Sequence, residues 1–195
     1  MKISFIMTVY NRARYLRAAL QALQLQGDSD MEVVIADDGS EPFELEATER
    51  IVEKCRFPVL LLKRQRDGFR LAAARNEAIR NSKGEYLFFV DCDIVLLRDA
   101  VAIHRRKAGP GLFLVGNRGL LDQEYTGHLL AGEITPALLD EAWDRADHAE
   151  IGRAARGFAR NAWLRRIGLA KRHKPKLLGC HFSLHRVDIE RVNGF

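Results

Sequence analysis

The sequence predicts a Rossmann-like α/β fold, in which a mostly parallel sheet is flanked by helices. Short apolar runs alternate with helical apolar patterns over the first 97 residues, which is typical of parallel strands joined by right-handed crossovers. Polar clusters directly follow three of these runs, and ligands of such sheets bind where loops leave the carboxyl ends of strands. The 195 residues are 47% hydrophobic, which is enough for one domain with a sizeable core.

The expected elements follow from these patterns in chain order. Runs rich in β-branched or aromatic side chains predict strands at residues 3–10, 32–36, 59–63 and 86–90. Helical spacing of apolar residues predicts helices at residues 15–23, 45–55 and 70–81. In the less regular second half, we expect a strand at residues 112–116 and helices at residues 136–150 and 152–168.

The sharpest chemical signal is Asp91-Cys92-Asp93, directly after the apolar run YLFFV. Two carboxylates at the end of a buried strand are costly unless a cation satisfies them. Mg²⁺ and Mn²⁺ favour oxygen ligands and often join one or two carboxylates to substrate phosphates. The alternative is an acidic turn that caps the next segment. Because other polar clusters accompany it, we interpret this motif as a metal site.

Two further clusters follow the first and second strands. Asp37-Asp38-Gly39-Ser40 is strong turn chemistry, and a carboxylate there could also accept the imide N–H of uracil. The segment from Thr8 through Tyr10 and Asn11 to Arg12 either simply ends a strand or frames a base with its backbone and the Tyr10 ring. The convergence of three clusters at strand ends predicts one shared crevice.

A fourth cluster joins a glycine turn to a helix start. Its charged residues are Asp67, Arg70 and Arg75, and Gly68 makes the turn. A helix N-terminus beside arginines favours phosphate, whereas an ordinary solvated helix face is the alternative.

These four clusters, in this order, resemble the family 2 glycosyltransferases of GT-A fold. The similarity is clearest over residues 3–97 and in the segments GFRLAAARN and GEYLFFVDCD, which are similar to those of polymerases of the chondroitin-synthase type and of lipopolysaccharide transferases. Residues 176–184 and 192–195 are similar to a later block of the family that often reads G-G-N-F-S and N-G-F-D-E. The resemblance therefore implies a single GT-A domain, with a nucleotide-binding half at 1–97 and a partial acceptor-binding half at 98–195.

The resemblance also implies roles for particular residues. Asp38 or Asp37 would contact uracil with Thr8 and Tyr10 nearby, Asp91 would face the ribose or sugar, and Asp93 would bind Mn²⁺ or Mg²⁺. Contacts to ribose, phosphate or the protein itself are expected from Asp67, Arg70 and Arg75. The sugar and acceptor pocket would be lined by Gly179, Cys180, His181 and Phe182. Here the family's G-G-N is G-C-H, whose side chains are bulkier, so the resemblance leaves the donor sugar open.

The implied reaction is transfer of a sugar from a UDP-sugar to a glycan or lipid-linked acceptor, with inversion. In the family the general base lies in an acidic pair after N-G-F-D-E, and this sequence ends at Phe195. We therefore expect the base and the rest of the catalytic segment to lie beyond residue 195, and leave the base unassigned. The alternatives are a binding fragment without catalysis or an interaction protein. A nucleotidyltransferase would need a glycine-rich loop, which TVYNRARY lacks.

The net charge of +5 is concentrated in one stretch. Residues 151–187 contain ten Lys or Arg and no Asp or Glu, which suggests an anionic partner. A solvated helix face is one interpretation of the 151–176 stretch, and peripheral contact with a membrane surface is another. No nucleic-acid motif accompanies the charge, so we do not expect nucleic-acid binding. Three cysteines without zinc spacing, and no leader-like start, favour a cytoplasmic protein at the inner face of the membrane.

Overall fold

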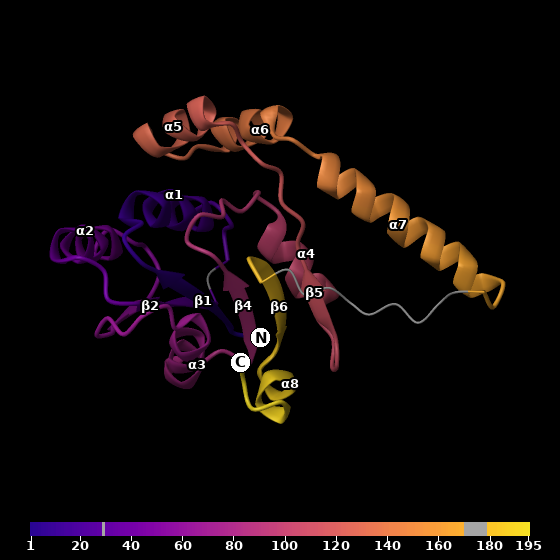
Figure 1. The fold of residues 1–195 in the computed structure, drawn as a ribbon, viewed down its shortest axis with the longest axis horizontal. Coiled ribbons are helices and arrows are strands. Elements are labelled where there is room, and N and C mark those ends of the chain that lie inside the picture. Colours follow the sequence, from indigo (N-terminus) through magenta and orange to yellow (C-terminus); the bar gives the residue numbers. More distant parts are fainter. Residues whose placement is uncertain (29, 170–178) are drawn as a thin grey trace.

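The computed structural model describes residues 1–28, 30–169 and 179–195, which contain a six-stranded sheet flanked by helices (Figure 1). The strand order is β3-β2-β1-β4-β6-β5. The first four strands pair in parallel, while β6 runs antiparallel to both β4 and β5. The strands are β1 (Ile3–Val9), β2 (Met31–Asp37), β3 (Val59–Lys63), β4 (Tyr86–Val90), β5 (Phe113–Val115) and β6 (His181–His185).

The helices of the described residues cover both faces of this sheet. They are α1 (Ala13–Gln24), α2 (Pro42–Val52), α3 (Leu71–Asn81), α4 (Ala100–Lys107), α5 (Gln123–Ala131), α6 (Pro136–Arg145), α7 (Ala149–Arg166) and α8 (Arg186–Arg191). Successive side chains of a strand point to opposite faces. Phe5 of β1 therefore packs in one core with α1, α2 and α4, and its neighbour Ile6 packs in a second core with α3 and α8.

The expected Rossmann-like, mostly parallel sheet is confirmed, while one local prediction is wrong and one strand was missed. The helix expected at 136–150 is interrupted, because Ala146 is extended and Asp147 forms a bridge with Leu120. A new helix, α7, then begins at Ala149, whose N–H donates to the Asp147 carboxylate. Residues 181–185 form a central antiparallel strand that no pattern had indicated, because their partners lie about 90 residues earlier in the chain.

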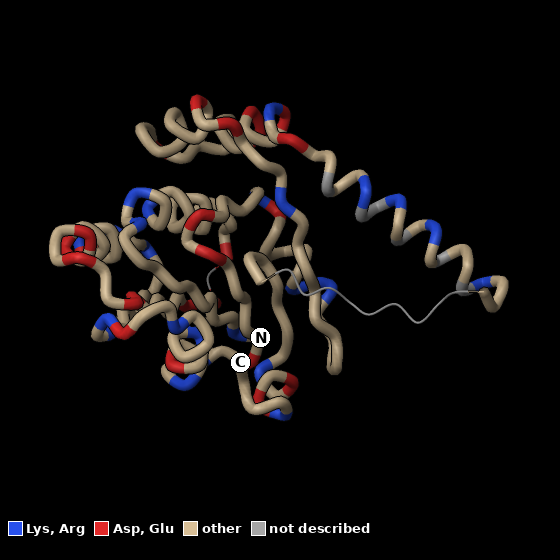
Figure 2. Tube along the Cα trace, viewed as in Figure 1, with Lys and Arg blue, Asp and Glu red and all other residues tan. Residues whose placement is uncertain are grey.

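Helices α5 and α6 form a layer above α1 rather than on the sheet (Figure 1). A third core holds them there, in which Ala18 and Ala22 of α1 meet Tyr125 and Leu129 of α5 and Leu139 of α6. Beyond them α7 projects away from the sheet, and arginine residues recur along it (Figures 1 and 2). Among the described residues, none of the helices is both long and apolar enough to cross a membrane.

Candidate functional site

The polar clusters after β1 and β2 are joined by direct hydrogen bonds. The N–H of Asp38 donates to the carbonyl of Val9 at 2.9 Å, and the N–H of Asn11 donates to Ser40 Oγ at 2.9 Å. Asn11 has a positive φ of 50°, and its Oδ1 accepts the N–H of Glu41 at 2.8 Å. Because β1 and β2 are adjacent and parallel, both loops leave the same edge of the sheet, as the sequence predicted.

The two neighbouring carboxylates after β2 have different tasks. Asp37 is 1% exposed, and its Oδ1 accepts the N–H groups of Gly39 and Ser40 at 3.1 and 2.8 Å. Its side chain thus closes the turn, which is the structural alternative raised by the sequence. The carboxylate of Asp38 instead faces the loop after β3, where it contacts Arg64 Nε at 3.3 Å and a guanidinium nitrogen of Arg66 at 3.2 Å.

Arg66 lies between the two groups that the sequence predicts to surround a base. Its guanidinium carbon is 3.9 Å from the centre of the Tyr10 ring, and the same guanidinium contacts Asp38. The close approach of this loop depends on Gly39, which has a φ of +80°: a Cβ there would lie 2.6 Å from the Arg66 backbone. A flat cation therefore covers the face of Tyr10 and the carboxylate of Asp38.

Behind the loop that follows β4, a buried arginine joins three elements. Arg75 of α3 is 6% exposed, and one guanidinium nitrogen donates to Asp91 Oδ1 at 2.9 Å and to the carbonyl of Gly179 at 2.7 Å. Burial raises the pKa of Asp91, the charge of Arg75 opposes this rise, and the Asp93 carboxylate adds to it. Arg75 thus positions Asp91 and the start of β6, which is the protein-contact alternative among its predicted roles.

The residues of the Asp91-Cys92-Asp93 motif differ in exposure. Asp93 is exposed, and within the described residues its carboxylate makes no hydrogen bond or ion pair. Burial, followed by the two flanking carboxylates, raises the pKa of the Cys92 thiol to about 12, so the thiol is protonated and a poor metal ligand at neutral pH. No group of three His, Cys, Asp or Glu side chains converges within the described residues. One free carboxylate beside a second, partly engaged one fits a cation that keeps waters and binds substrate phosphates.

Two of the remaining predicted nucleotide-site residues connect to Asp38 through hydrogen bonds, while the others lie elsewhere at this edge. Asp67 and Arg70 are exposed and pair with each other, and Gly68 makes its turn at a φ of +70°. The N–H of Arg70 also approaches Asp38 Oδ2 at 3.4 Å. Thr8 is partly buried at the end of β1, while Arg12 is exposed in the following turn.

The four predicted pocket residues at the start of β6 do not share one surface. Phe182 is 1% exposed and stacks on Phe89 at 4.5 Å between ring centres, so its expected place in the pocket lining is wrong: alternation along β6 turns it into the core. His181 faces the other way, where its ring lines a cavity and stacks near His104. Cys180 is buried and its carbonyl accepts the N–H of Asp91 at 3.0 Å, while Gly179 contributes its carbonyl to Arg75.

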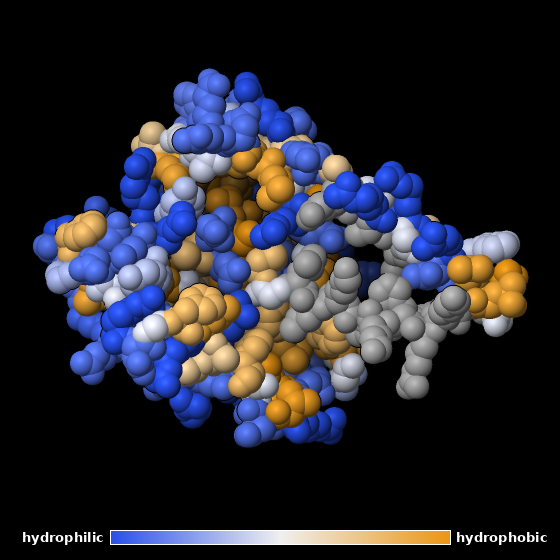
Figure 3. Space-filling view, viewed as in Figure 1, coloured by the Kyte–Doolittle hydropathy of each residue, from blue (hydrophilic) through white to orange (hydrophobic). Residues whose placement is uncertain are grey.

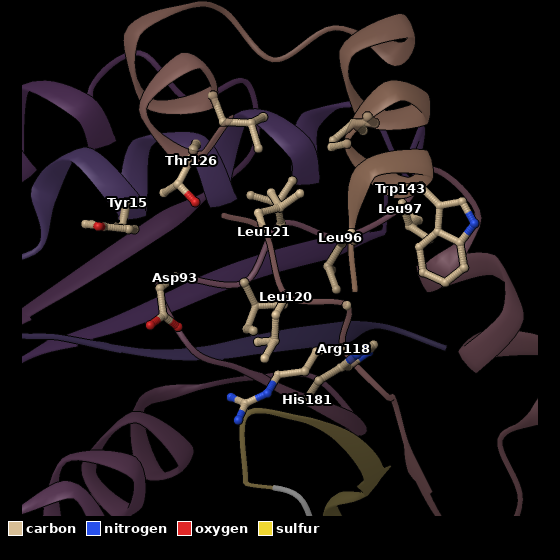
Figure 4. A pocket seen from close by; sticks show the side chains of 18 of the residues that line it. Tyr15, Asp93, Leu96, Leu97, Arg118, Leu120, Leu121, Thr126, Trp143 and His181 are labelled. Carbon is tan, nitrogen blue, oxygen red and sulfur yellow. The ribbon is translucent and has the colours of Figure 1, made fainter. Parts of the chain in front are cut away.

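A cavity of about 470 Å³ opens beside Asp93, between the end of β4 and the layer of α5 and α6. Hydrophobic side chains are visible at the bottom of this hollow in Figure 3. In the close view, Asp93 and Arg118 lie on one side of the leucines Leu120 and Leu121, and Trp143 lies on the other (Figure 4). The cavity thus has a charged side next to the predicted metal ligand and an aliphatic side away from it.

This geometry agrees with what comparison with known proteins finds. The sequence model of Glycosyl transferase family 2 matches residues 4–109. The chain belongs to that family. The glycosyltransferase YfnE of Bacillus subtilis is 37% identical over 105 residues, which is 53% of this chain and 26% of that protein. The E. coli chondroitin synthase is 39% identical over 97 residues, covering 47% of this chain and 13% of the synthase.

Solved structures show the same fold for this family 2 glycosyltransferase chain. The mannosyltransferase PcManGT from Pyrobaculum calidifontis, in complex with GDP-Man and Mn²⁺, superposes with a TM-score of 0.65 over 100% of this chain and 47% of its own, at 19% identity. Residues 1–349 of S. aureus TarS superpose with a TM-score of 0.50 over 64% of this chain and 40% of theirs, at 26% identity. The matched part of the chain covers 26% of the length of YfnE and 47% of the length of another Bacillus subtilis relative, the glycosyltransferase EpsH.

Three arginines of the site were missed by the sequence analysis. Arg64 and Arg66 hold Asp38, and the charge of Arg118 partly opposes the rise that burial causes in the pKa of Asp91. The only available signal for the first two was their place just after the third strand. Arg118 lies in the irregular second half, where no strand end or motif pointed to it.

Proposed function

We propose that this chain is the nucleotide-sugar-binding part, and some of the acceptor-binding part, of a metal-dependent glycosyltransferase. It would move a sugar from a UDP-sugar to a glycan or lipid-linked acceptor with inversion at the anomeric carbon. The observation that carries this proposal is the placing of Asp38 and Asp93 on loops that leave the same edge of one parallel sheet. Family membership supports the reaction class.

The base would bind between Tyr10 and Asp38. A uracil imide N–H would donate to the Asp38 carboxylate, which has lone pairs to spare beyond its contacts with Arg64 and Arg66. Since the Arg66 guanidinium lies on the Tyr10 ring, it has to leave that face before a base can stack there. Arg66 is 39% exposed as a side chain, so it can turn towards solvent or towards the diphosphate.

At the other end of the nucleotide, Asp93 and the outer oxygen of Asp91 would hold Mn²⁺ or Mg²⁺. When bound, such a cation neutralises the negative charge that develops on the leaving diphosphate. Arg75 fixes the orientation of Asp91, and Arg12 and Arg118 line the adjoining cavity, where they add positive charge. An acceptor hydroxyl would displace UDP at the anomeric carbon, with its proton taken by a carboxylate base that we assign to none of the described residues.

Calorimetry with UDP and Mn²⁺ tests the donor half of this proposal. We expect saturable binding that requires the cation and falls at least tenfold in Asp93→Ala, because the free carboxylate is lost. The matched control is Asp144→Ala, which removes an equally exposed carboxylate on α6. Equal UDP binding by the wild type, Asp93→Ala and Asp144→Ala proteins would show that Asp91-Cys92-Asp93 is an acidic turn and not a metal site.

Sugar transfer separates the enzyme from its alternative, a nucleotide-sugar-binding protein without catalysis. The readout is release of UDP from a UDP-sugar in the presence of an acceptor, compared between this chain and any longer version of it. Release that depends on both the acceptor and Asp93 supports the transferase. Tight UDP binding without release from either chain supports the binding protein.

Helix α7 is our candidate for contact with the inner face of the membrane. Among its described side chains, Arg153, Arg156 and Arg160 carry positive charge, and Trp163 is 60% exposed. Ala155, Phe158 and Ala162 are apolar residues of the same helix, but their side chains lie outside the described residues, as do residues 170–176 of the basic stretch. Co-sedimentation with phosphatidylglycerol vesicles, but not phosphatidylcholine vesicles, at low salt would support this contact.

A further inference from the structure

We infer that the cavity beside Asp93 is the acceptor site and that it takes an acceptor with a hydrocarbon chain and an anionic phosphate head. The inference rests on the proposed function and narrows its acceptor class from glycan or lipid-linked to lipid-linked.

The size of the cavity exceeds what packing defects leave in a folded protein. Empty spaces in protein cores are few and small, and one of about 150 Å³ lined by aliphatic side chains is enough to bind benzene. The volume here is about 470 Å³, roughly three times as large. Ligand pockets typically span about 300–1,000 Å³.

The deep side of the cavity is aliphatic and comes from four elements. Side chains from α1, the loop after β4, α5 and α6 line it, among them Ala18, Leu96, Leu129, Leu130, Leu139 and Ala142. A sugar or peptide backbone would leave its polar groups without partners against such a wall, which is costly. A hydrocarbon chain has no such groups and gains about 0.8 kcal/mol for each methylene removed from water.

The mouth of the cavity is positively charged where it meets the donor site. Arg12 and Arg118 line it together with Asp93, and no ion pair of either arginine occurs within the described residues. Two arginines without carboxylate partners complement a phosphate head. Because Asp93 lines this same cavity, an acceptor anchored by its chain would present its head beside the donor. An anionic oxygen of the phosphate head would then take the place of the acceptor hydroxyl: it would form the bond to the anomeric carbon as the bond to UDP breaks, and it carries no proton to remove.

The protein contains its own reporter for this site. Trp143 lines the cavity and is 40% exposed, and the only other tryptophan is Trp163 on α7. In a Trp163→Phe background, titration with dodecyl phosphate should therefore shift the Trp143 emission to the blue and saturate. Inorganic phosphate should leave the emission unchanged, because the head alone does not reach the aliphatic side.

Substitutions of two alanines on α6 test where the hydrocarbon chain of the ligand binds. Ala142 lines the cavity and is 8% exposed, whereas Ala137 of the same helix is exposed and lies outside the lining. We expect Ala142→Phe to weaken dodecyl phosphate binding at least tenfold and Ala137→Phe to change it less than twofold. Arg118→Ala provides a second variant that needs no change in packing, and it should weaken dodecyl phosphate binding about tenfold.

The outcomes separate this inference from the proposed function, because UDP and Mn²⁺ binding is measured on the same proteins. Retained UDP binding in Ala142→Phe with loss of dodecyl phosphate binding supports the inference and shows that the variant folds. UDP binding without dodecyl phosphate binding in the wild-type chain, or dodecyl phosphate binding that Ala142→Phe and Arg118→Ala both leave unchanged, overturns it while the donor site stands. Dodecyl phosphate binding without UDP binding would overturn the proposed function instead.

Discussion

The parallel sheet and the segment that carries α5 and α6 differ in how completely their side chains are packed. Every residue of β2 and of β4 is buried, and both faces of these strands are covered by helices. Helices α5 and α6 each bury two residues, and the space between them and the sheet holds the cavity. The sheet is therefore held by dense packing on both faces, whereas the segment of α5 and α6 is held by the smaller core that it forms with α1.

Buried polar contacts strengthen the same contrast. Glu32 of β2 accepts hydrogen bonds from Ser4 Oγ at 2.6 Å and from the N–H of Lys83, and Ser4 Oγ accepts the N–H of Gly84 at 2.7 Å. Burial opposes ionisation of Glu32, but these hydrogen bonds and Lys2 leave its pKa below its usual value. This network connects the start of β4 to β1 and β2. Among the described residues of α5 and α6, no such network of buried polar side chains occurs.

The largest effect should come from Gly84→Ala in the densely packed region. A Cβ there would lie 2.5 Å from Ser4 Oγ and 2.6 Å from the Ser4 backbone nitrogen. Because backbone atoms of β1 cannot give way, we expect a loss of about 3 kcal/mol or more in the free energy of unfolding. Urea denaturation measures this loss, and a loss below about 1 kcal/mol would show that β1 is less constrained than its burial indicates.

The second largest effect should be a loss of stability at acidic pH. It should arise from two buried histidines between the sheet and α4. Burial lowers the pKa of His104 to about 4, and burial together with His104 lowers that of His181 to about 4. Both values lie below the unfolded value of about 6.5, so the unfolded chain binds more protons in between. The stabilisation that the two neutral histidines provide is therefore complete above pH 6.5. As the pH falls towards 4, the free energy of unfolding should decrease by about 2–3 kcal/mol.

Stability measured against pH checks this prediction, with His181→Phe as the variant. Phenylalanine can keep the ring between Phe88 and His104, whose centres lie 5.3 and 5.0 Å away. The variant should lose about half of the pH dependence in this window. An unchanged pH profile would mean that His181 is not the group that titrates.

Arg186→Ala should cost about 2 kcal/mol, because it leaves several buried carbonyls without donors. The guanidinium of Arg186 donates to the carbonyls of Gly84, Ile79 and Ser82 at 2.7, 3.0 and 3.0 Å. It thereby satisfies the C-terminus of α3, where helix carbonyls lack partners within the helix. Arg191→Ala is the control, since that side chain is 77% exposed and its removal should change thermal stability little.

The smallest effect is expected for Gly127→Ala in α5, which belongs to the loosely packed segment. This substitution should raise the free energy of unfolding rather than lower it. Gly127 lies inside α5 with nothing within 4 Å of an added Cβ. Alanine should therefore stabilise the chain by about 0.5–1 kcal/mol, since it reduces the entropy of the unfolded state and favours the helix. Destabilisation in the same urea assay would indicate that α5 packs more closely than the structure describes.

Much of the fold of residues 3–97 could be predicted from local pattern. The runs at residues 3–10 and 86–90 are strands because apolar residues of this kind fit a sheet covered on both faces. The same pattern placed Asp38 and Asp93 at one edge, since parallel strands end together. It could not separate the roles of Asp37 and Asp38, because which carboxylate closes the turn depends on backbone geometry.

The sequence by itself determined the alternation of strands and helices over residues 3–97, the family and the edge at which a ligand would bind, because each of these follows from residues close together in the chain. Only the tertiary structure decided that residues 181–185 lie against β4, that Arg75 fixes Asp91 and that an apolar cavity opens beside Asp93. These features join residues that lie between about 16 and about 170 positions apart. Contacts at such separations depend on how faces and edges pack together, which the spacing of residue types along the chain does not encode.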